Sequence, residues 1–322
     1  MNAMTIRLTH VLLCLATCFP ACIFAEEGAE DAAQDPDFAI QGEYVGEVTS
    51  GEKKQPLGIQ VIARGEGEFG SLWYYGGLPG DGWDPREPLI QGSTVDQLTK
   101  FQQAGLTAQV IEGAIVVTNE KGVVLGTLKK VVRRSSTLNA KPPEKAVVLF
   151  DGSTADTFEN GKLTEDKLLM PGATSKARLG SGTLHIEFFI PFDPKGASRG
   201  NSGCYLQSRY EVQILDSFGF APHNHECGGI PGVKAADVNM TFPPGSWQTY
   251  DVDFTAPVFK DGQKVSDAIM TVRHNGVVTH QDVKVPGVTQ SAPLEEGPDP
   301  GPLNLQEHGG QVRFRNIWFV ER

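Results

Sequence analysis

The stretch Gly200–Ser217, GNSGCYLQSRYEVQILDS, predicts two short strands around a tight turn. Successive side chains of a strand point to opposite faces, so Glu211 and Gln213 are expected on one face and Val212 and Ile214 on the other. The apolar pair is suited to a core, whereas an acid beside an amide is not. The stretch therefore predicts a sheet with one buried face and one polar face.

A tight turn also predicts how the two strands pair. If residues 208–209 form a two-residue turn, Leu206 pairs with Glu211 and Cys204 pairs with Gln213. In that register Cys204 lies on the polar face of the hairpin.

Cysteine usage leaves two alternatives for the folded part of the chain. Three of the five cysteines lie within the first 25 residues, so Cys204 and Cys227 remain. The first alternative is a disulfide between Cys204 and Cys227, which an exported protein can form. The second is a pair of buried free thiols, because free cysteine packs as a small hydrophobe.

The N-terminus predicts export. Arg7 precedes the apolar run Val11–Ala25, which is too short to span a bilayer, and residues 1–25 are therefore interpreted as a signal peptide. The alternative is a lipoprotein anchored through Cys18 or Cys22. Either way the protein is expected in the periplasm or outside the cell. No later segment is apolar and long enough to predict a membrane span.

Composition narrows the fold class and the partners. A net charge of −11 and a pI near 5.1 argue against nucleic acid and anionic membrane surfaces as partners. The chain has 37 glycines, 21 prolines and few helical patterns, which favours an all-β protein rich in turns.

The order of composition along the chain predicts two β domains. An acidic, disordered leader is expected over residues 26–37. Strand-like runs over 38–135 predict a small β-barrel or sandwich of unknown role, interrupted by a helical candidate at Val95–Ala104. A polar, proline-containing linker follows at 136–145, and residues 146–322 are long enough for a larger two-sheet sandwich.

Glu211 is the first candidate for chemistry. Retaining glycosidases need two carboxyl groups about 5–5.5 Å apart, which alternate residues of one strand provide. Here Glu211 is followed on its face by Gln213 and Leu215, and Asp216 falls on the opposite face unless a bulge intervenes. The chain is therefore not expected to be an ordinary retaining glycosidase. The alternative is that Glu211 and Gln213 are a solvated polar pair.

Two further groups of residues suggest chemistry. His308 precedes a strand that carries Arg315, an arrangement suited to proton transfer and anion stabilisation. The alternatives are a turn cap for His308 and a structural ion pair for Arg315. His223, His225 and Glu226 form a weak candidate metal site, and the alternative is a solvated polar loop.

Several motifs taken together resemble the 3-keto-disaccharide hydrolase family, whose members are also described as 3-keto-glycoside hydrolases and lyases. The resemblance covers about residues 146–322 and implies a concanavalin A-like jelly roll with a ligand groove on its concave face. The motifs are LFDG (149–152), GNSGCYLQSRYEVQILDS (200–217), ECGGI (226–230), WQTYDVDF (247–254), HNG (274–276) and LQEHGGQVRFRNIW (305–318).

The resemblance implies that a base removes the proton next to a C3 keto group and that the C1 substituent is then eliminated. Such a site needs one base, an enolate stabiliser and hydroxyl-binding groups, and it needs no second carboxylate. Glu211 or His308 is the expected base, and Arg315 or a divalent metal is the expected stabiliser. The expected substrate-binding residues are Asn201, Tyr205, Gln213, Asp216 and Gln306. A non-catalytic glycan-binding module of the cell surface is the alternative.

Overall fold

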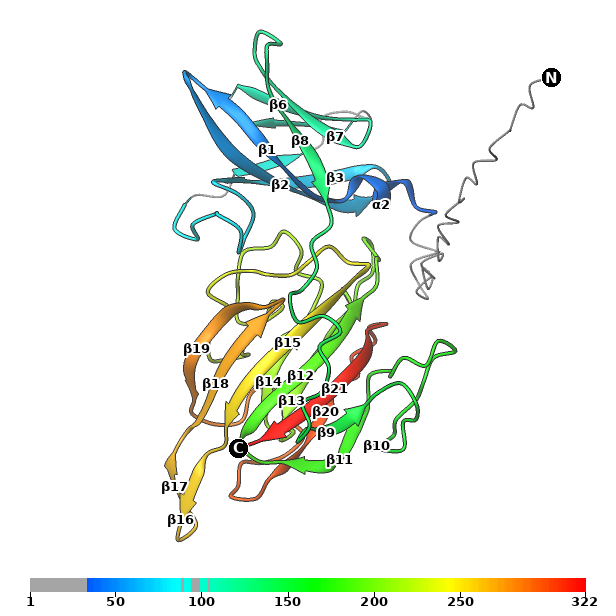
Figure 1. The fold of residues 1–322 in the computed structure, drawn as a ribbon, viewed down its shortest axis with the longest axis vertical. Coiled ribbons are helices and arrows are strands. Elements are labelled where there is room, and N and C mark those ends of the chain that lie inside the picture. Colours follow the sequence, from blue (N-terminus) through cyan, green and yellow to red (C-terminus); the bar gives the residue numbers. More distant parts are fainter. Residues whose placement is uncertain (1–33, 88–89, 94–98, 104) are drawn as a thin grey trace, which may run out of the picture.

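The computed structural model describes residues 34–87, 90–93, 99–103 and 105–322 (Figure 1). These residues form an all-β protein with one short helix, α2 (Pro36–Ile40). The predicted signal peptide and the lipoprotein cysteines lie outside them. In the described part of the chain, no helix is long and apolar enough to cross a membrane.

Residues 34–37, which were expected in the disordered leader, are folded, and the rest of the expected leader, residues 26–33, lies outside the described residues. Asp35 caps α2 by accepting a hydrogen bond from the Asp37 backbone, and Asp37 itself is buried. The Asp37 carboxylate also accepts the backbone N–H of Gly67 at 3.1 Å. Residues 34–37 therefore belong to the folded domain, because Asp35 and Asp37 satisfy backbone donors rather than remaining in solvent.

The N-terminal domain is a nearly closed β-barrel. Its eight strands form one antiparallel sheet in the order β4-β3-β2-β1-β8-β7-β6-β5, and the edge strands β4 and β5 contact each other. The strands are β1 (Gly42–Ser50), β2 (Lys53–Gly65), β3 (Glu68–Tyr75), β4 (Ile90–Ser93), β5 (Lys100–Gln103), β6 (Leu106–Ile111), β7 (Ala114–Asn119) and β8 (Val124–Val131). Tyr44, Ile59, Trp73, Phe101 and Leu128 fill its core.

The helical candidate Val95–Ala104 is wrong where it can be compared with the structure. Lys100–Gln103 is strand β5, and Phe101 points into the barrel core. Tertiary burial of Phe101 against the other strands overrides the local helical pattern. The remainder of the candidate, apart from Thr99, lies outside the described residues.

The C-terminal domain is a two-sheet sandwich. One sheet has the order β10-β11-β20-β13-β14 and the other the order β19-β18-β15-β12-β21-β9. A separate hairpin joins β16 to β17. The strands are β9 (Val147–Phe150), β10 (Phe158–Glu159), β11 (Thr174–Leu179), β12 (Gly182–Ile190), β13 (Ser202–Leu206), β14 (Tyr210–Ile214), β15 (Ser246–Thr255), β16 (Val258–Lys260), β17 (Gln263–Ser266), β18 (Ala268–His274), β19 (Val277–Val285), β20 (Gly301–Leu305) and β21 (Arg313–Glu321).

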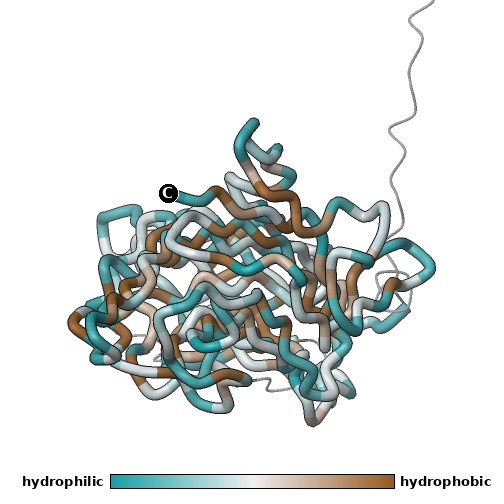
Figure 2. Tube along the Cα trace, turned by 90° about the horizontal axis from the view of Figure 1, so that it is seen from below, coloured by the Kyte–Doolittle hydropathy of each residue, from teal (hydrophilic) through white to brown (hydrophobic). Residues whose placement is uncertain are grey.

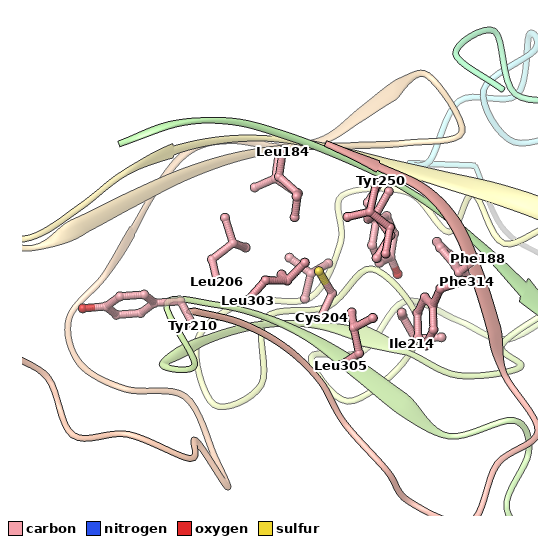
Figure 3. Close-up of a cluster of buried hydrophobic side chains, with 14 of the residues drawn as sticks. Leu184, Phe188, Cys204, Leu206, Tyr210, Ile214, Tyr250, Leu303, Leu305 and Phe314 are labelled. Carbon is pink, nitrogen blue, oxygen red and sulfur yellow. The ribbon is translucent and has the colours of Figure 1, made fainter. Parts of the chain in front are cut away.

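The core of this domain lies between the two sheets, and the all-β fold class is confirmed. Leu206 and Leu305 from the five-stranded sheet face Leu184, Tyr250 and other residues of the six-stranded sheet (Figure 3). Hydrophobic stretches run through the middle of the tube, and many of the outlying loops are hydrophilic (Figure 2). Each sheet therefore has an outer face on which polar side chains can meet a ligand.

The hairpin register differs by one residue from the prediction. Tyr205 pairs with Glu211 and Cys204 pairs with Val212. The connection has three residues, Gln207–Arg209, and both Gln207 and Ser208 have positive φ. A register shift of one residue moves each side chain of one strand to the other face relative to its partner. Tyr205 therefore accompanies Glu211 outside.

The same shift explains why the disulfide alternative is wrong. Cys204 lies in the core between the sheets, and both Cys204 and Cys227 are buried free thiols. The Cys227 sulfur lies 3.1 Å from the Tyr250 hydroxyl, so a polar contact accompanies its packing.

The predicted linker, residues 136–145, is docked on the outer face of the six-stranded sheet. Figure 1 shows the chain passing from β8 along this sheet to β9. The Thr137 hydroxyl donates to Asp251 at 2.6 Å. The Ala140 carbonyl accepts from Asn316 and from the Trp318 indole. A polar segment that looks like a free spacer in sequence is thus held by hydrogen bonds to the sandwich.

The two domains share an apolar interface. Trp83 from the barrel packs against the cluster formed by Val238, Met240 and Phe242 of the sandwich. The Arg133 guanidinium, which is paired with Glu43, also lies 5.1 Å from the centre of the Phe242 ring. Buried apolar surface and a cation–π contact hold the barrel against one end of the sandwich.

Candidate functional site

A polar row crosses the outer face of the five-stranded sheet. Thr174 on β11 pairs with Asn304 on β20, Asn304 pairs with Tyr205 on β13, and Tyr205 pairs with Glu211 on β14. Directly paired residues project to the same face of a sheet. The row therefore places four polar side chains from four strands together, on the face away from the core.

Glu211 is the titratable group of this row. Its side chain is only 3 % exposed, and burial raises its pKa from the ordinary value to about 7, although the neighbouring Tyr205 hydroxyl opposes this shift. Gly203 makes room for the carboxylate, because a Cβ atom there would overlap Glu211 Oε1. A carboxyl group with a pKa near neutrality is suited to accept and return a proton.

Tyr205 and three amides surround the carboxylate. The Tyr205 hydroxyl donates to the Gln290 carbonyl at 2.8 Å and accepts from Gln306 Nε2 at 3.3 Å. Gln213 and Gln306 are half-buried, and the Asn304 amide donates to Thr174 Oγ1 at 2.9 Å. The structure thus brings together four predicted residues, Glu211, Tyr205, Gln213 and Gln306.

Sequence reasoning missed Asn304 and Thr174. The signal for Asn304 was its place between Leu303 and Leu305, which both lie in the core. This alternation predicts that the amide points outward. Thr174 has no comparable signal, because its pairing to Asn304 depends on which strands are neighbours in the sheet.

Arg315 is not part of this site, and the expectation that it stabilises an enolate beside Glu211 is wrong. Arg315 lies on the outer face of the six-stranded sheet, whereas Glu211 lies on the outer face of the other sheet. The hydrophobic core separates the two faces. The Arg315 guanidinium instead pairs with Glu187 at 2.8 Å and stacks 3.8 Å from the centre of the Trp247 ring.

Glu187 is the centre of a buried polar network under the docked linker. Its carboxylate accepts from Arg315, from Asn316 at 2.8 Å and from the Asn139 backbone. His185 lies 3.6 Å away and hydrogen-bonds Asp251 at 2.7 Å. A bulge in β21 with Asn316 at φ 45° turns Arg315 and Asn316 toward this carboxylate.

The pKa values in this network shift in opposite directions, as in ion pairs. Burial raises the pKa of Glu187, but its interactions with His185, Asn316 and Arg315 outweigh burial and lower it to about 2. Burial lowers the pKa of His185, but its interactions with Asp251 and Glu187 outweigh burial and raise it. Within the described residues these groups supply one another with polar partners, as buried polar groups require.

Three other predicted residues lie beyond the row. Asp216 follows β14, accepts the Phe218 backbone N–H at 3.2 Å, and has its pKa raised to about 6 by burial. Asn201 precedes β13, and its Oδ1 has no hydrogen-bond partner among the described residues. His308 is exposed in the turn after β20, and its role as a base stays a prediction.

The candidate metal residues do not converge. Glu226 binds Arg199 at 2.8 Å and accepts from the Ser217 hydroxyl at 2.6 Å. His223 and His225 are exposed and stack on each other with ring centres 5.6 Å apart. Within the described ranges, no group of three or more His, Cys, Asp and Glu residues is arranged to hold a metal ion. The predicted ligand set is therefore wrong, because Glu226 serves an ion pair.

Comparison with known proteins identifies relatives of the sandwich. Residues 145–320 match the model of the 3-keto-alpha-glucoside-1,2-lyase-like domain. No protein of curated function is significantly similar to the chain. A crystal structure of a candidate glycosyl hydrolase from Parabacteroides distasonis is 33% identical, with a TM-score of 0.50, and covers 56% of this chain and 84% of its own.

A second candidate glycosyl hydrolase structure from Parabacteroides distasonis is 18% identical and covers 58% of this chain and 92% of its own. Its TM-score of 0.36 is too low to carry an argument.

Proposed function

Since the chain belongs to the family of 3-keto-alpha-glucoside-1,2-lyase-like domains, we propose that it cleaves 3-keto-glycosides with Glu211 as the base. The family and the candidate glycosyl hydrolase that the chain resembles support a glycoside hydrolase- or lyase-like function. The observation that carries the proposal is a buried carboxylate with a pKa near 7 beside a tyrosine and several amides. In the described row Glu211 pairs with Tyr205, and the row continues with Asn304 and Thr174, so none of its other members is a carboxylate. The site lacks the carboxyl pair of a retaining glycosidase and suits a reaction that needs one base.

The proposed reaction begins with proton transfer. A ketone at C3 makes the C2 hydrogen acidic, and the Glu211 carboxylate takes this proton. The C1–C2 double bond forms as the C1–O bond breaks, and the leaving alkoxide takes the proton from Glu211 to become the free alcohol. Water then adds across the enone, with hydroxide at C1 and a proton at C2. The net result is hydrolysis, and Glu211 returns to its starting state.

The surrounding side chains fit the other tasks of this site. The half-buried amides of Gln213, Asn304 and Gln306 offer donors and acceptors to sugar hydroxyls, and the Tyr205 hydroxyl can donate to an oxyanion once its bond to the Gln290 carbonyl opens. At 3 % exposure, the carboxylate needs local opening before a sugar reaches it. The segment to open contains Gln290, which holds the Tyr205 hydroxyl.

The direct test is to incubate the purified protein with 3-keto-disaccharides and to follow release of the two sugars, with and without a chelator. We expect release of a free sugar and of a 3-keto sugar. Loss of activity with the chelator would add a metal ion to the mechanism. If the folded protein releases nothing from any of several 3-keto-glycosides, the proposal fails and glycan binding without turnover becomes the better hypothesis.

Replacing Gly203 with Ala is expected to lower kcat/KM at least tenfold. The new Cβ would overlap Glu211 Oε1 and lie 2.9 Å from a ring carbon of Tyr205, so both side chains must move. Steady-state kinetics with a 3-keto-disaccharide measures the effect. Gly287→Ala is the matched control, because a Cβ there meets nothing within 4 Å. Equal kcat/KM for the two variants would contradict the assigned site.

A further inference from the structure

A pocket of about 330 Å³ lies between the barrel and the sandwich. It is separate from the row on the five-stranded sheet, because it contains none of Glu211, Tyr205 and Asn304. Its volume falls at the small end of the range for ligand pockets. Its lining includes Arg64 and Gln91 from the barrel and Asp193, Asp216 and Phe220 from the sandwich.

Close packing at the domain interface preforms this pocket. Gly219 lies so near Ile62 of β2 that a Cβ atom would overlap the isoleucine side chain. At the adjoining rim, Phe38 and Phe192 pack edge to face with ring centres 5.2 Å apart. Together with the Trp83 cluster, these contacts hold the two walls at a set separation.

The Arg64 side chain lies over a glycine of the barrel wall. Its guanidinium crosses Gly70 of β3, where a Cβ atom would come within 2.7 Å of its Nη2. Glycine at position 70 therefore leaves room for the Arg64 side chain along the wall of the pocket.

The lining carries charges of both signs. The pocket contains two arginines, Arg64 and Arg199, and two aspartates, Asp193 and Asp216. Arg199 is already engaged, since it binds Glu226 at 2.8 Å and donates to the Asp216 carbonyl at 2.6 Å. A phosphate would meet the two aspartates, and a metal ion would meet the Arg64 guanidinium, so a neutral ligand fits best.

Phe220 adds a stacking surface. Its side chain is 44% exposed although it is a large hydrophobic residue, and Arg199 covers one side of the ring at 4.3 Å from its centre. An exposed aromatic ring beside guanidinium, amide and carboxylate groups is suited to a ligand with apolar faces and a polar rim. Sugar rings have C–H faces and hydroxyl edges, and so combine both properties.

We propose that this pocket is a second saccharide-binding site, formed jointly by the two domains, which takes a neutral mono- or disaccharide. Phe220 stacks on a sugar ring, and Arg64, Gln91 and Asp216 bind its hydroxyls. The barrel thereby gains a role in ligand capture. The site is independent of the reaction proposed at Glu211, because it needs neither a keto group nor a base.

Calorimetric titration of the folded protein with cellobiose and with maltose tests this site. Neither sugar carries a 3-keto group, so binding is measured without turnover. We expect binding that weakens at least fivefold in Arg64→Ala and in Phe220→Ala. Both residues are exposed, so the variants are expected to fold, and their melting temperatures check this. Lys121→Ala, an exposed turn residue outside the pocket, is expected to bind like the parent.

The remaining outcomes each contradict the inference. Binding of neither sugar, or equal affinity in the parent and both pocket variants, would overturn it. Binding of inorganic phosphate that depends on Arg64, without sugar binding, would show an anion site instead. Loss of sugar binding in Glu211→Gln with no loss in Arg64→Ala would place the sugar on the five-stranded sheet. That last result would overturn the interdomain site and leave the proposed function intact.

Discussion

Replacing Glu211 with Gln is expected to lower kcat on a 3-keto-disaccharide by about 10²- to 10⁴-fold, the usual contribution of a positioned general base. Glutamine keeps the size and a hydrogen-bonding oxygen of the side chain, so the neighbouring Tyr205 loses little packing. It cannot take the C2 proton. Glu165→Gln, at an exposed carboxylate of the same domain, is the matched control and should keep the parent rate. An unchanged rate in Glu211→Gln would remove this residue from the mechanism.

The pH profile of the parent enzyme gives a second readout for Glu211. Only the deprotonated carboxylate accepts a proton, and burial raises the pKa of Glu211 to about 7. The parent kcat/KM is therefore expected to rise with pH through about 7 and then to level off. The residual activity of Glu211→Gln should lack this rise. A parent profile that is flat between pH 5 and 8 would contradict the assignment.

A melting temperature distinguishes a variant that has lost only the base from a variant that has lost the fold. A carboxyl group whose folded pKa is raised favours folding in its protonated form. That contribution is present below the unfolded pKa of about 4.3 and is lost as the pH rises through about 7, where the buried group must ionise. Glutamine never ionises, so Glu211→Gln is expected to melt at or above the parent temperature at pH 8.

Replacing Glu187 with Ala is expected to destabilise the sandwich by about 3–5 kcal/mol, because breaking a buried ion pair leaves charged partners unpaired. Glu187 is 0 % exposed and accepts hydrogen bonds from Arg315, Asn316 and the Asn139 backbone. Urea unfolding at pH 7, followed by tryptophan fluorescence, measures the change. Glu165→Ala should stay within about 0.5 kcal/mol of the parent.

The contribution of Glu187 to folding stability changes with pH in the opposite direction to the contribution of Glu211. The folded pKa of Glu187 is lowered to about 2, so its contribution to stability is present above the unfolded pKa of about 4.3. That contribution is lost as the pH falls toward 2. The difference in the free energy of unfolding between the parent and Glu187→Ala should therefore become smaller in acid. A difference under 1 kcal/mol at pH 7, or one that widens in acid, would contradict the structural role of this network.

Local alternation in the sequence correctly predicted the orientation of the central residues of the candidate site. Glu211 and Gln213 point outward and Val212 and Ile214 point into the core, because the side-chain period of a strand is two wherever the strand runs. The family motifs placed Tyr205 and Gln306 with them, and the structure brings these residues together. The predicted strand pairing of Cys204 with Gln213 was wrong, because the turn has three residues rather than two and this shifts the register by one residue.

Arg315 shows what alternation leaves open. Like Glu211 it points outward, yet the two residues lie on different sheets with the core between them. Periodicity indicates whether a side chain points in or out, but not which sheet receives its strand. Strand order is decided by long-range packing, and no local pattern records it.

The amino-acid sequence by itself determined the all-β class, the family of the sandwich and the outward position of Glu211. These features depend on local periodicity and on residues that are close in the chain. The tertiary structure alone decided that Thr174 and Asn304 complete the row, that the linker covers Glu187, and that two domains enclose a pocket. Each of these features joins segments far apart in sequence, and such contacts form only when the whole chain buries its apolar surface.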